Sequence, residues 1–253
     1  MFGICNLAIV PIRLESNHRS EMVSELLFGE HFEIVETIKG WVKIKLHFDK
    51  YEGWIDEKQF HPISENEFGL LSAREMILNA DLIEYISGKD NLLFPIPLGA
   101  SLSFIDVPQI NTAEFSFEGL KISGKNPKSE ILKTAFMYLN TPYLWGGKTP
   151  FGIDCSGFVQ MVYKLNGHQL FRDANQQATQ GEVLSFIEEA EAGDLAFFDN
   201  EEGKITHVGI LMNDNYIIHA HGKVRIDRLD HLGIMNVDTK RHTHKLRVIK
   251  KII

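Results

Sequence analysis

The sequence changes character at Ser123-Gly124-Lys125-Asn126, and this change restricts the fold more than any other feature. Before it, short apolar segments alternate with turn-forming residues, a pattern typical of small antiparallel sheets. After it, a helical pattern comes first and several strand-like segments follow, which predicts an α+β domain. We therefore expect a β-rich front part and an α+β domain over residues 124–253.

The front part divides into two predicted modules. Residues 1–62 predict a small antiparallel barrel or sandwich, with glycine-containing turns between strands at Cys5–Pro11, Glu30–Thr37, Trp41–Phe48 and Glu52–Ile55. Residues 63–123 predict a second small β-rich module, with a short helix over Ser72–Asn79 and strands at Asp90–Pro97 and Ala100–Val107.

The back part begins with two predicted helices. Asn126 is the expected N-cap of the first, which should end near Asn140 because Pro142 disfavours helical geometry in the preceding residue. The second should begin at or just before Cys155 and end at Gly167. Predicted strands follow at Asp194–Asp199, Thr206–Met212, Tyr216–Ala220, Lys223–Asp227 and Lys245–Ile252.

The distribution of charge restricts the class of ligand. Residues 1–123 hold 10 Lys and Arg against 19 Asp and Glu, a net charge of −9, whereas residues 124–253 hold 16 against 15, a net charge of +1. A nucleic-acid binder needs clustered basic side chains, so this balance argues against one. An acidic front half is better suited to a ligand that carries an amine.

The two cysteines and the N-terminus bear on the cellular compartment. Cys5 and Cys155 are too few for a disulfide framework, and their local settings make a bridge between them an improbable pairing. No basic region precedes the first apolar segment, no small-residue cleavage site follows it, and the apolar segments are too short to span a membrane. We expect a cytoplasmic protein, or a periplasmic one if a signal peptide was removed.

Cys155 is the strongest single indication of chemistry. The segment Gly152-Ile153-Asp154-Cys155-Ser156-Gly157 places its thiol where a loop turns into a helix. The positive end of a helix dipole favours the thiolate, the reactive form of cysteine. A lone cysteine is otherwise usually a small buried apolar residue, as Cys5 is expected to be.

Two histidines could serve the thiol. His207 and His219 occupy mirrored positions about residue 213 in a predicted hairpin, so they should face each other, one orienting the other. A lone histidine in a strand is more often structural, and His207, His219 and His221 with Cys155 could also bind Zn²⁺ by residue type. The spacing lacks the usual short-range pairs of zinc ligands, so we expect no metal and no cofactor.

Several segments in order resemble a known family. They are Tyr143-Leu144-Trp145-Gly146-Gly147, Asp154-Cys155-Ser156-Gly157-Phe158, Arg172-Asp173-Ala174, Ala192 to Phe198, Thr206-His207-Val208-Gly209 and Ile218-His219. Together they resemble NlpC-type peptidoglycan cysteine endopeptidases over about residues 124–253. The front part is similar to bacterial SH3-like modules, notably at Glu21-Met22-Val23, Gly40-Trp41-Val42 and Tyr51-Glu52-Gly53-Trp54.

The resemblance implies a fold and a set of catalytic roles. It implies a papain-like α+β domain, with helices packed on an antiparallel sheet, preceded by one or two SH3-like barrels. Cys155 would be the nucleophile, His207 the general base and His219 the residue that orients it. The Cys155 backbone N–H and Tyr143 would stabilise the oxyanion.

The resemblance also implies substrate contacts. Trp145, Asp154 and Ser156 would line the cleft, Arg172-Asp173 would form a further wall, and Tyr51 would project from the front module. Glu21 would bind a substrate ammonium, with Val23 as the alternative register. Asp154 could instead only cap the helix, and Tyr51 and Trp54 could instead belong to the core of the barrel.

The implied activity is hydrolysis of the γ-D-glutamyl-L-diamino acid bond, to diaminopimelate or Lys, in murein peptides with a free N-terminal L-Ala, during cell-wall recycling or turnover. The alternatives are an amidase or acyltransferase with the same residues, and a non-catalytic module that binds wall peptides. We expect a monomer that binds murein peptide and neither nucleic acid nor membrane.

Overall fold

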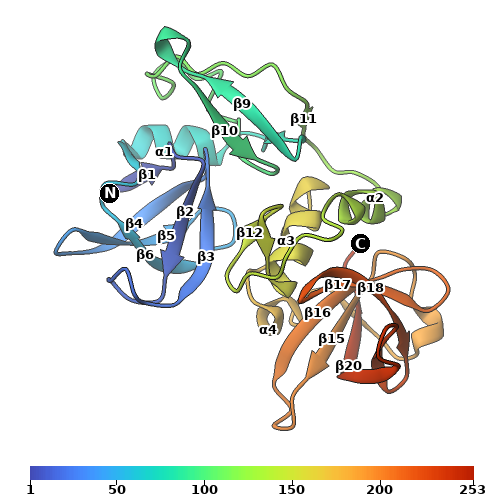
Figure 1. The fold of residues 1–253 in the computed structure, drawn as a ribbon. Helices are drawn as coiled ribbons and strands as arrows, with labels where there is room; N and C mark the ends of the chain where they lie inside the picture. Colours follow the sequence, from blue (N-terminus) through green and yellow to red (C-terminus); the bar gives the residue numbers. More distant parts are fainter. The chain divides into compact units, whose positions relative to one another are not determined.

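The computed structural model describes residues 1–253 except for the side chain of Asp90. The chain divides into two compact units, Met1–Lys125 and Asn126–Ile253, and the boundary lies within the predicted linker (Figure 1). Within the described chain, no helix is both long and apolar enough to cross a membrane.

The first unit contains a seven-stranded antiparallel sheet in the order β3-β2-β6-β5-β4-β1-β7. Its strands are β1 (Phe2–Ile4), β2 (Ile9–Arg13), β3 (Met22–Leu27), β4 (His31–Ile38), β5 (Trp41–Leu46), β6 (Glu52–Asp56) and β7 (His61–Ile63). Burial alternates along β5, where Val42, Ile44 and Leu46 enter the core, as expected for a sheet with one covered face. Three of the predicted strands correspond to β4, β5 and β6. The fourth, Cys5–Pro11, is wrong, because the Cys5 N–H bonds to the Glu30 carbonyl and the chain turns before β2 begins.

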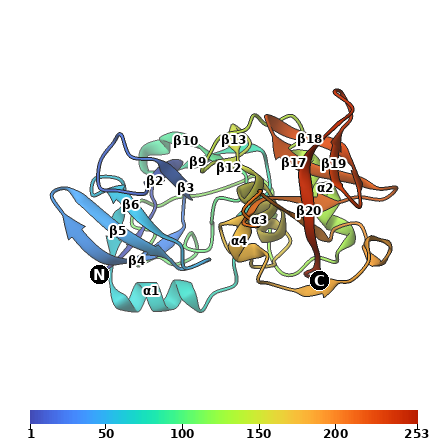
Figure 2. The ribbon, with the colours of Figure 1, turned by 90° about the horizontal axis from the view of Figure 1, so that it is seen from below.

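The rest of this unit combines one helix with short strands. The elements are α1 (Glu65–Ser72), β8 (Leu78–Asn79), β9 (Ile83–Ser87), η1 (Lys89–Asn91), β10 (Leu93–Pro97) and β11 (Lys121–Ile122). The helix predicted over Ser72–Asn79 is wrong, since α1 ends where that helix was expected to begin. A capping box starts α1 earlier: the Ser64 hydroxyl accepts from the Glu67 N–H, and the Glu67 carboxylate accepts from the Ser64 N–H at 2.6 Å. Figure 2 shows α1 beside β4, which it contacts together with β1.

Residues 63–123, predicted as a second small β-rich module, contain short strands. Their strands form separate two-stranded sheets, β9 with β10 and β8 with β11. The strand predicted over Ala100–Val107 is wrong, because its backbone makes turns in which Ile105 bonds to Leu102 and Val107 to Phe104.

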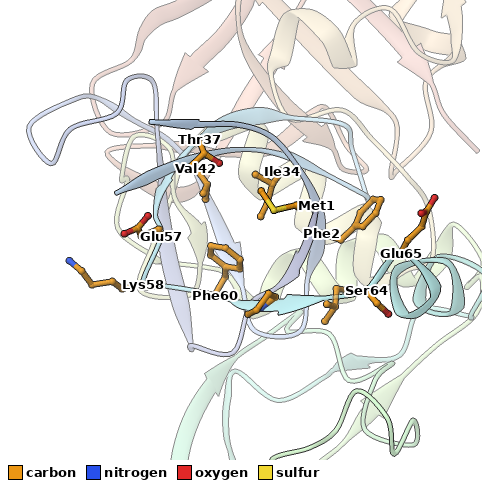
Figure 3. Close-up of a pocket in the computed structure, with 12 residues that line it drawn as sticks. Met1, Phe2, Ile34, Thr37, Val42, Glu57, Lys58, Phe60, Ser64 and Glu65 are labelled. Atoms are coloured by element: carbon orange, nitrogen blue, oxygen red, sulfur yellow. The ribbon is translucent and has the colours of Figure 1, made fainter. Parts of the chain in front are cut away.

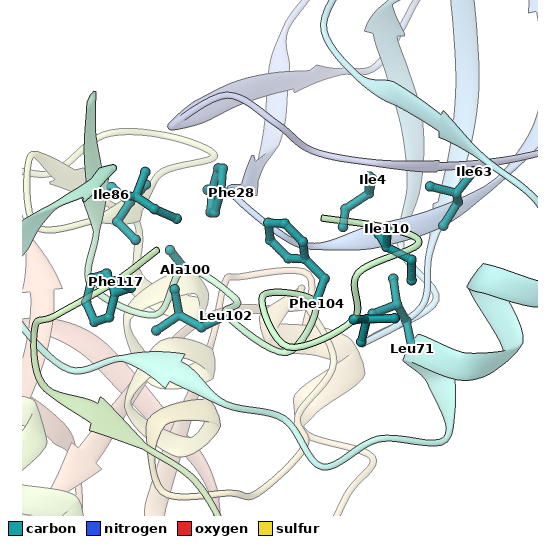
Figure 4. Packing of buried hydrophobic residues seen from close by; sticks show 12 residues of the cluster. Ile4, Phe28, Ile63, Leu71, Ile86, Ala100, Leu102, Phe104, Ile110 and Phe117 are labelled. Atoms are coloured by element: carbon teal, nitrogen blue, oxygen red, sulfur yellow. The ribbon is translucent and has the colours of Figure 1, made fainter. Parts of the chain in front are cut away.

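These turns deliver apolar side chains to a core shared with the first sheet. Leu102, Phe104 and Val107 from the turns join Ile4 and Phe28 in one buried cluster (Figure 4). Burying apolar side chains in such a cluster stabilises the whole unit, so residues 63–125 pack with the first sheet in one compact unit.

The second unit combines helices with a closed antiparallel sheet. The helices are α2 (Ser129–Met137), α3 (Cys155–Leu165), α4 (Ala174–Gln177) and the short η2 (Ile187–Glu189). The strands are β12 (Lys148–Thr149), β13 (Gly152–Ile153), β14 (Glu182–Leu184), β15 (Leu195–Asp199), β16 (Ile205–Leu211), β17 (Tyr216–His221), β18 (Lys223–Asp230), β19 (Gly233–Asn236) and β20 (Arg241–Lys251).

The main sheet runs β14-β20-β15-β16-β17-β18-β19, and β19 also pairs with β20. This extra pairing closes six strands of the predicted antiparallel sheet into a barrel, and the closure is what the sequence did not predict. Helix α3 contacts β16 and β17. The predicted strands correspond to β15, β16, β17, β18 and β20, and the predicted second helix to α3.

The start of the first predicted helix is wrong. Helix α2 begins at Ser129, three residues after the expected N-cap at Asn126. The Asn126 N–H bonds to the Asn166 carbonyl at 3.0 Å, and His168 Nε2 hydrogen-bonds the Asn126 carbonyl at 3.2 Å. These bonds hold Asn126 against the end of α3 and so delay the first helical turn.

Candidate active site

Cys155 is the first residue of α3, and its position is fixed by the residue before it. Asp154 is the N-cap, and its Oδ1 accepts from the Gly157 N–H at 2.6 Å. Its Oδ2 accepts from the Gly146 N–H at 2.8 Å, which ties the preceding loop to the same helix end. The carboxylate therefore fixes both the start of the helix and the loop that leads to it.

Asp154 also forms a buried ion pair. Arg172 is 1% exposed, and its Nη2 and Nη1 donate to the two Asp154 oxygens at 2.6 and 3.0 Å. Arg172 Nη1 also donates to the Ser156 hydroxyl at 3.0 Å. Arg172 was predicted to form a wall of the cleft, and its guanidinium lies in the interior. Asp154 and Ser156, predicted to line the cleft, are buried and bonded to this guanidinium, so this geometry assigns them a supporting role.

The Cys155 sulfur lies against the backbone of strand β16. Its two contacts there are with the residues immediately before and after His207. Its Sγ is 4.0 Å from the Thr206 carbonyl oxygen and is close enough to the Val208 N–H to interact with it. The side chain is nearly enclosed, with 6% of the residue exposed. The sulfur therefore lies against the backbone of β16 at His207, the histidine predicted to act on it.

The charge state of Cys155 differs from the prediction. Burial, and then the nearby Asp154 carboxylate, raise the pKa of the thiol to about 12, against smaller opposing effects of the Val208 and Ser156 N–H groups and Arg172. Burial, and then His219, hold the pKa of His207 well below its usual value. Both shifts favour a neutral thiol and a neutral imidazole, whereas the position at a helix start alone predicted a thiolate.

His207 and His219 form a hydrogen-bonded pair, with His207 Nε2 2.8 Å from His219 Nδ1. His207 comes from β16 and His219 from the neighbouring β17, and both are buried. The predicted hairpin centre at residue 213 is wrong by one position: Ile210 pairs with Ile218 and Leu211 with Ile217, so the register is centred on residue 214. The two histidines are therefore diagonal neighbours.

Gly209 lies opposite His219 in this register. A Cβ atom at residue 209 would lie 2.9 Å from the His219 Cβ and 2.7 Å from Ile217 Cδ1, closer than side chains approach. The absence of a side chain at Gly209 thus leaves room for the His219 ring to reach diagonally to His207.

Asp227 is a further member of the site that was not predicted from the sequence. Its Oδ2 lies 3.0 Å from His219 Nε2, on the side of the ring away from His207. Arg225 binds the same carboxylate, with Nε 2.8 Å from Oδ2 and Nη2 2.9 Å from Oδ1. The sequence contained an indication of this contact. Arg225 and Asp227 are two residues apart in the predicted strand that follows the strand of His219, and residues two apart on a strand share a face.

His244 was also missed. Its ring stacks on that of His207, with centroids 4.0 Å apart and an interplanar angle of 24°. Its pKa is lowered to about 4, first by burial and then by His219 and His221. His244 therefore covers one face of His207 as a neutral ring.

The arrangement of imidazoles differs from the zinc ligand set considered from the sequence. The nitrogens of His207, His219 and His244 lie within 4.8 Å of one another, while Cys155 and His221 fall outside this group. Two of these nitrogens already share a hydrogen bond. His207 Nε2 and His219 Nδ1 are thus already engaged with each other.

Tyr143 and Trp145 lie in the loop that precedes the β12–β13 hairpin. The Tyr143 hydroxyl interacts electrostatically with Cys155, and burial is the main cause of the raised pKa of the phenol, so it is protonated at neutral pH. Trp145 is 59% exposed, as expected of a side chain available to a ligand. Asp173, predicted to contact substrate, is half-buried and is the N-cap of α4.

Two predicted substrate-binding residues belong to the first unit. Glu21 is exposed just before β3, and Tyr51 packs against the core of the sheet together with Val23. A pocket of about 850 Å³ in this unit is lined by Phe2, Ile34 and other mainly apolar residues (Figure 3). Neither Glu21 nor Tyr51 lines this pocket, which is therefore separate from the predicted amine site.

Comparison with known proteins connects these features to two families. Residues 140–243 match the NlpC/P60 family, and residues 12–60 match the bacterial dipeptidyl-peptidase Sh3 domain. The first match contains Tyr143, Cys155, His207 and His219.

Similar proteins are found in several bacteria. A gamma-D-glutamyl-L-lysine dipeptidyl-peptidase of Bacillus cereus is 26% identical over 233 residues, which cover 82% of this chain and 70% of that protein. Dipeptidyl-peptidase 6 of Lysinibacillus sphaericus is 27% identical over 248 residues, which cover 85% and 87%. A Bacillus subtilis protein with the same name as the first is 42% identical over 98 residues, and this match covers 38% of the chain but only 33% of that protein.

A solved structure shares the fold along the whole chain. The crystal structure of an NlpC/P60 family protein from Bacillus cereus ATCC 10987 has a TM-score of 0.79 and 18% identity, and the match covers 100% of this chain and 99% of that one. The chain therefore carries an NlpC/P60-family domain at residues 140–243, preceded by a bacterial dipeptidyl-peptidase Sh3 domain at residues 12–60.

Proposed function

We propose that the protein is a cysteine endopeptidase that hydrolyses the bond between γ-D-glutamate and an L-diamino acid in peptidoglycan peptides with a free N-terminal L-Ala. One observation carries the proposal. The Cys155 sulfur lies against the β16 backbone at His207, and His207 is hydrogen-bonded to a second buried histidine. The names of the relatives from Bacillus cereus and Bacillus subtilis support the choice of bond. We place the reaction in the turnover or recycling of the cell wall.

The first half of the reaction transfers an acyl group to sulfur. His207 accepts the Cys155 proton while the sulfur attacks the γ-carbonyl carbon of D-Glu. The tetrahedral intermediate then breaks its C–N bond, and the His207 proton passes to the departing amine of the diamino acid. An L-Ala-γ-D-Glu thioester remains on Cys155.

The second half releases the acyl group. A water molecule gives its proton to His207 and attacks the thioester carbonyl. When the C–S bond breaks, the sulfur takes that proton back from His207, and L-Ala-γ-D-Glu leaves as a γ-carboxylic acid, which then gives its own proton to the solvent. Each step conserves protons, and the neutral thiol and imidazole of the free protein are restored.

Two donors are available for the oxyanion that forms in each half. The Cys155 backbone N–H is at the first turn of α3, where N–H groups have no partner within the helix. The Tyr143 hydroxyl is protonated and near the sulfur. Loss of one oxyanion donor typically raises a reaction barrier by about 3–4 kcal/mol, so Tyr143→Phe is expected to lower kcat by roughly 10²–10³.

Recognition of the L-Ala amine is assigned to Glu21, with Tyr51 and Trp145 as further contacts. An ammonium withdrawn from water needs a carboxylate partner. Glu21 belongs to the acidic front half, and Asp173 is a half-buried carboxylate in the peptidase unit.

The test is hydrolysis of L-Ala-γ-D-Glu-L-Lys and of L-Ala-γ-D-Glu-diaminopimelate, followed by mass spectrometry. We expect release of the free diamino acid, loss of release in Cys155→Ala, and much weaker release from the N-acetylated peptides. Cleavage of the acetylated peptides at the same rate as the free peptides would refute the amine site but not the endopeptidase activity. No cleavage of either peptide by the wild type, with turnover of another amide or ester, would refute the endopeptidase.

A further inference from the structure

Asp227 is a fully buried carboxylate held by four donors. His219 Nε2 and Arg225 Nε approach its Oδ2 at 3.0 and 2.8 Å, and Arg225 Nη2 and the Val237 N–H approach its Oδ1, each at 2.9 Å. Burial acts to raise the pKa of Asp227, but these hydrogen bonds outweigh it and hold the pKa well below its usual value. The carboxylate is therefore ionised, and every contact it makes is one in which it accepts.

An acceptor at this place dictates where the protons of the two histidines lie. Asp227 can only accept, so His219 must carry its proton on Nε2. In a neutral His219, Nδ1 then has a lone pair, and His207 Nε2 must donate to it across the 2.8 Å contact. A neutral His207 with its proton on Nε2 has its lone pair on Nδ1. In this tautomer Nδ1 can act as the base that accepts the proton of the Cys155 thiol.

We propose that Asp227 is a positioning residue that acts through His219 to hold His207 in the tautomer able to accept the Cys155 proton. The catalytic group is then a relay of Cys155, His207, His219 and Asp227, with Arg225 fixing its far end. The inference rests on the proposed function, because it assigns His207 the role of base to a nucleophilic thiol.

Arg225 keeps the carboxylate at the end of the relay ionised and fixed in orientation. Arg225 pairs with His219 across β17 and β18, and Arg225 and Asp227 lie on one face of β18. Arg225 also binds the exposed Asp238 at 2.7 Å. Two hydrogen bonds from one guanidinium set the orientation of the Asp227 carboxylate and keep it charged, so that the proton stays on His219.

Asp154, Arg172 and Tyr143 surround the Cys155 end of the relay, and two further histidines surround its His219 end. His221 on β17 and His244 on β20 are close to His219, with ring centroids at 6.1 and 5.8 Å. Both approach His219 through ring contacts, whereas Asp227 hydrogen-bonds His219 Nε2 directly. We therefore assign the control of the tautomer to Asp227.

The direct test is NMR of protein labelled with ¹⁵N-histidine, in which long-range ¹H–¹⁵N couplings identify the protonated ring nitrogen of each residue. In the wild type we expect His219 and His207 both protonated on Nε2. Protonation of either neutral ring on Nδ1 would overturn the proposal. This readout needs no substrate, so it stands apart from the failure of the proposed peptidase activity.

The matching variant is Asp227→Asn. An amide that donates to His219 Nε2 moves the His219 proton to Nδ1 and the His207 proton to its Nδ1, which removes the base. The equivalent change in a Ser-His-Asp triad lowers kcat by about 10⁴, so we expect a loss of roughly 10²–10⁴ in kcat with little change in KM. We also expect activity to recover as pH rises, because hydroxide can replace the lost base.

Two further variants keep the result interpretable. Asp227→Glu retains an acceptor and should keep the wild-type tautomers and most of the activity, even if Asp227→Asn does not fold. Asp230→Asn is a matched control, since Asp230 also binds a histidine, His242, at 2.9 Å, but outside the relay. Asp230→Asn should leave the His207 and His219 signals and kcat unchanged. A folded Asp227→Asn with wild-type tautomers and full activity would overturn the proposal.

Discussion

Cys155 carries its proton in the free protein, because its sulfur is nearly enclosed and an acidic side chain precedes it. The pKa of the thiol is raised to about 12 by burial and by Asp154, so the thiolate fraction must grow with pH throughout the neutral range. We expect alkylation by iodoacetamide to accelerate by about tenfold per pH unit between pH 6 and 9, without a plateau at acidic pH. Intact-mass measurements would follow the rate, with Cys155→Ala as the blank. A plateau extending to pH 5 would show a preformed thiolate and contradict the assignment.

The buried ion pair of Asp154 and Arg172 stabilises the start of the helix that holds Cys155. Replacement of Asp154 by Asn leaves the guanidinium without its anionic partner in the interior. Removal of one partner of a buried pair typically costs about 3–5 kcal/mol, so we expect a loss of this size in the free energy of unfolding in urea.

The matched control for this variant is Glu130→Gln, which removes an exposed ion pair with Lys133 at 2.7 Å on α2. Exposed pairs contribute about 0–1 kcal/mol. Similar small losses in both variants would mean that the Asp154–Arg172 pair does not support the helix start.

At the scale of elements, the β16–β17 hairpin aligns the two histidines, and Gly209 permits the alignment. In Gly209→Ala, the new Cβ would meet His219 Cβ at 2.9 Å and Ile217 Cδ1 at 2.7 Å, so β17 must shift. A shift of about 1 Å at a catalytic group can reduce the rate about 10²-fold. We expect such a loss in kcat, together with a change in the His219 NMR signal. Gly69→Ala on α1 serves as the control, since a Cβ there meets nothing within 4 Å. Wild-type activity in Gly209→Ala would exclude this role for the glycine.

The elements also show what the sequence can predict. The strands of the second unit and helix α3 were predictable because apolar residues recur with a clear period and Asp154 caps the helix. The start of α1 was not predicted, although a local signal for it, the Ser64–Glu67 capping box, is present in the sequence. The turns around Phe104 could not be read locally, because their apolar side chains are spaced to meet a core formed by residues distant in sequence.

The candidate site was predictable to the same extent. Cys155 and its two histidines stand in recognisable local patterns, so they could be identified without a structure. Asp227 and His244 reach the site only through pairing with β17 and through closure of the barrel by β20. Nor could the protonation of Cys155 be read from its helix position, since the degree of burial decides the balance between the helix dipole and desolvation.

At the scale of the whole molecule, the chain joins two units that each have their own buried clusters. The peptidase unit contains the nucleophile, its histidines and the residues that hold them. The first unit contributes the excess of acidic residues and the proposed contacts Glu21 and Tyr51. In this account the second unit performs the chemistry, and the first unit adds selectivity for a peptide with a free amine.

The most direct test is to capture the acyl-enzyme. The protein is mixed with L-Ala-γ-D-Glu-L-Lys, quenched in acid within the first turnover and examined by intact mass and by peptide mapping. The account predicts a mass increase of one L-Ala-γ-D-Glu acyl group on the peptide that contains Cys155, removable by hydroxylamine as a thioester and absent from Cys155→Ala. Hydrolysis of the peptide by Cys155→Ala at the wild-type rate, or an acyl group mapped to another residue, would contradict it.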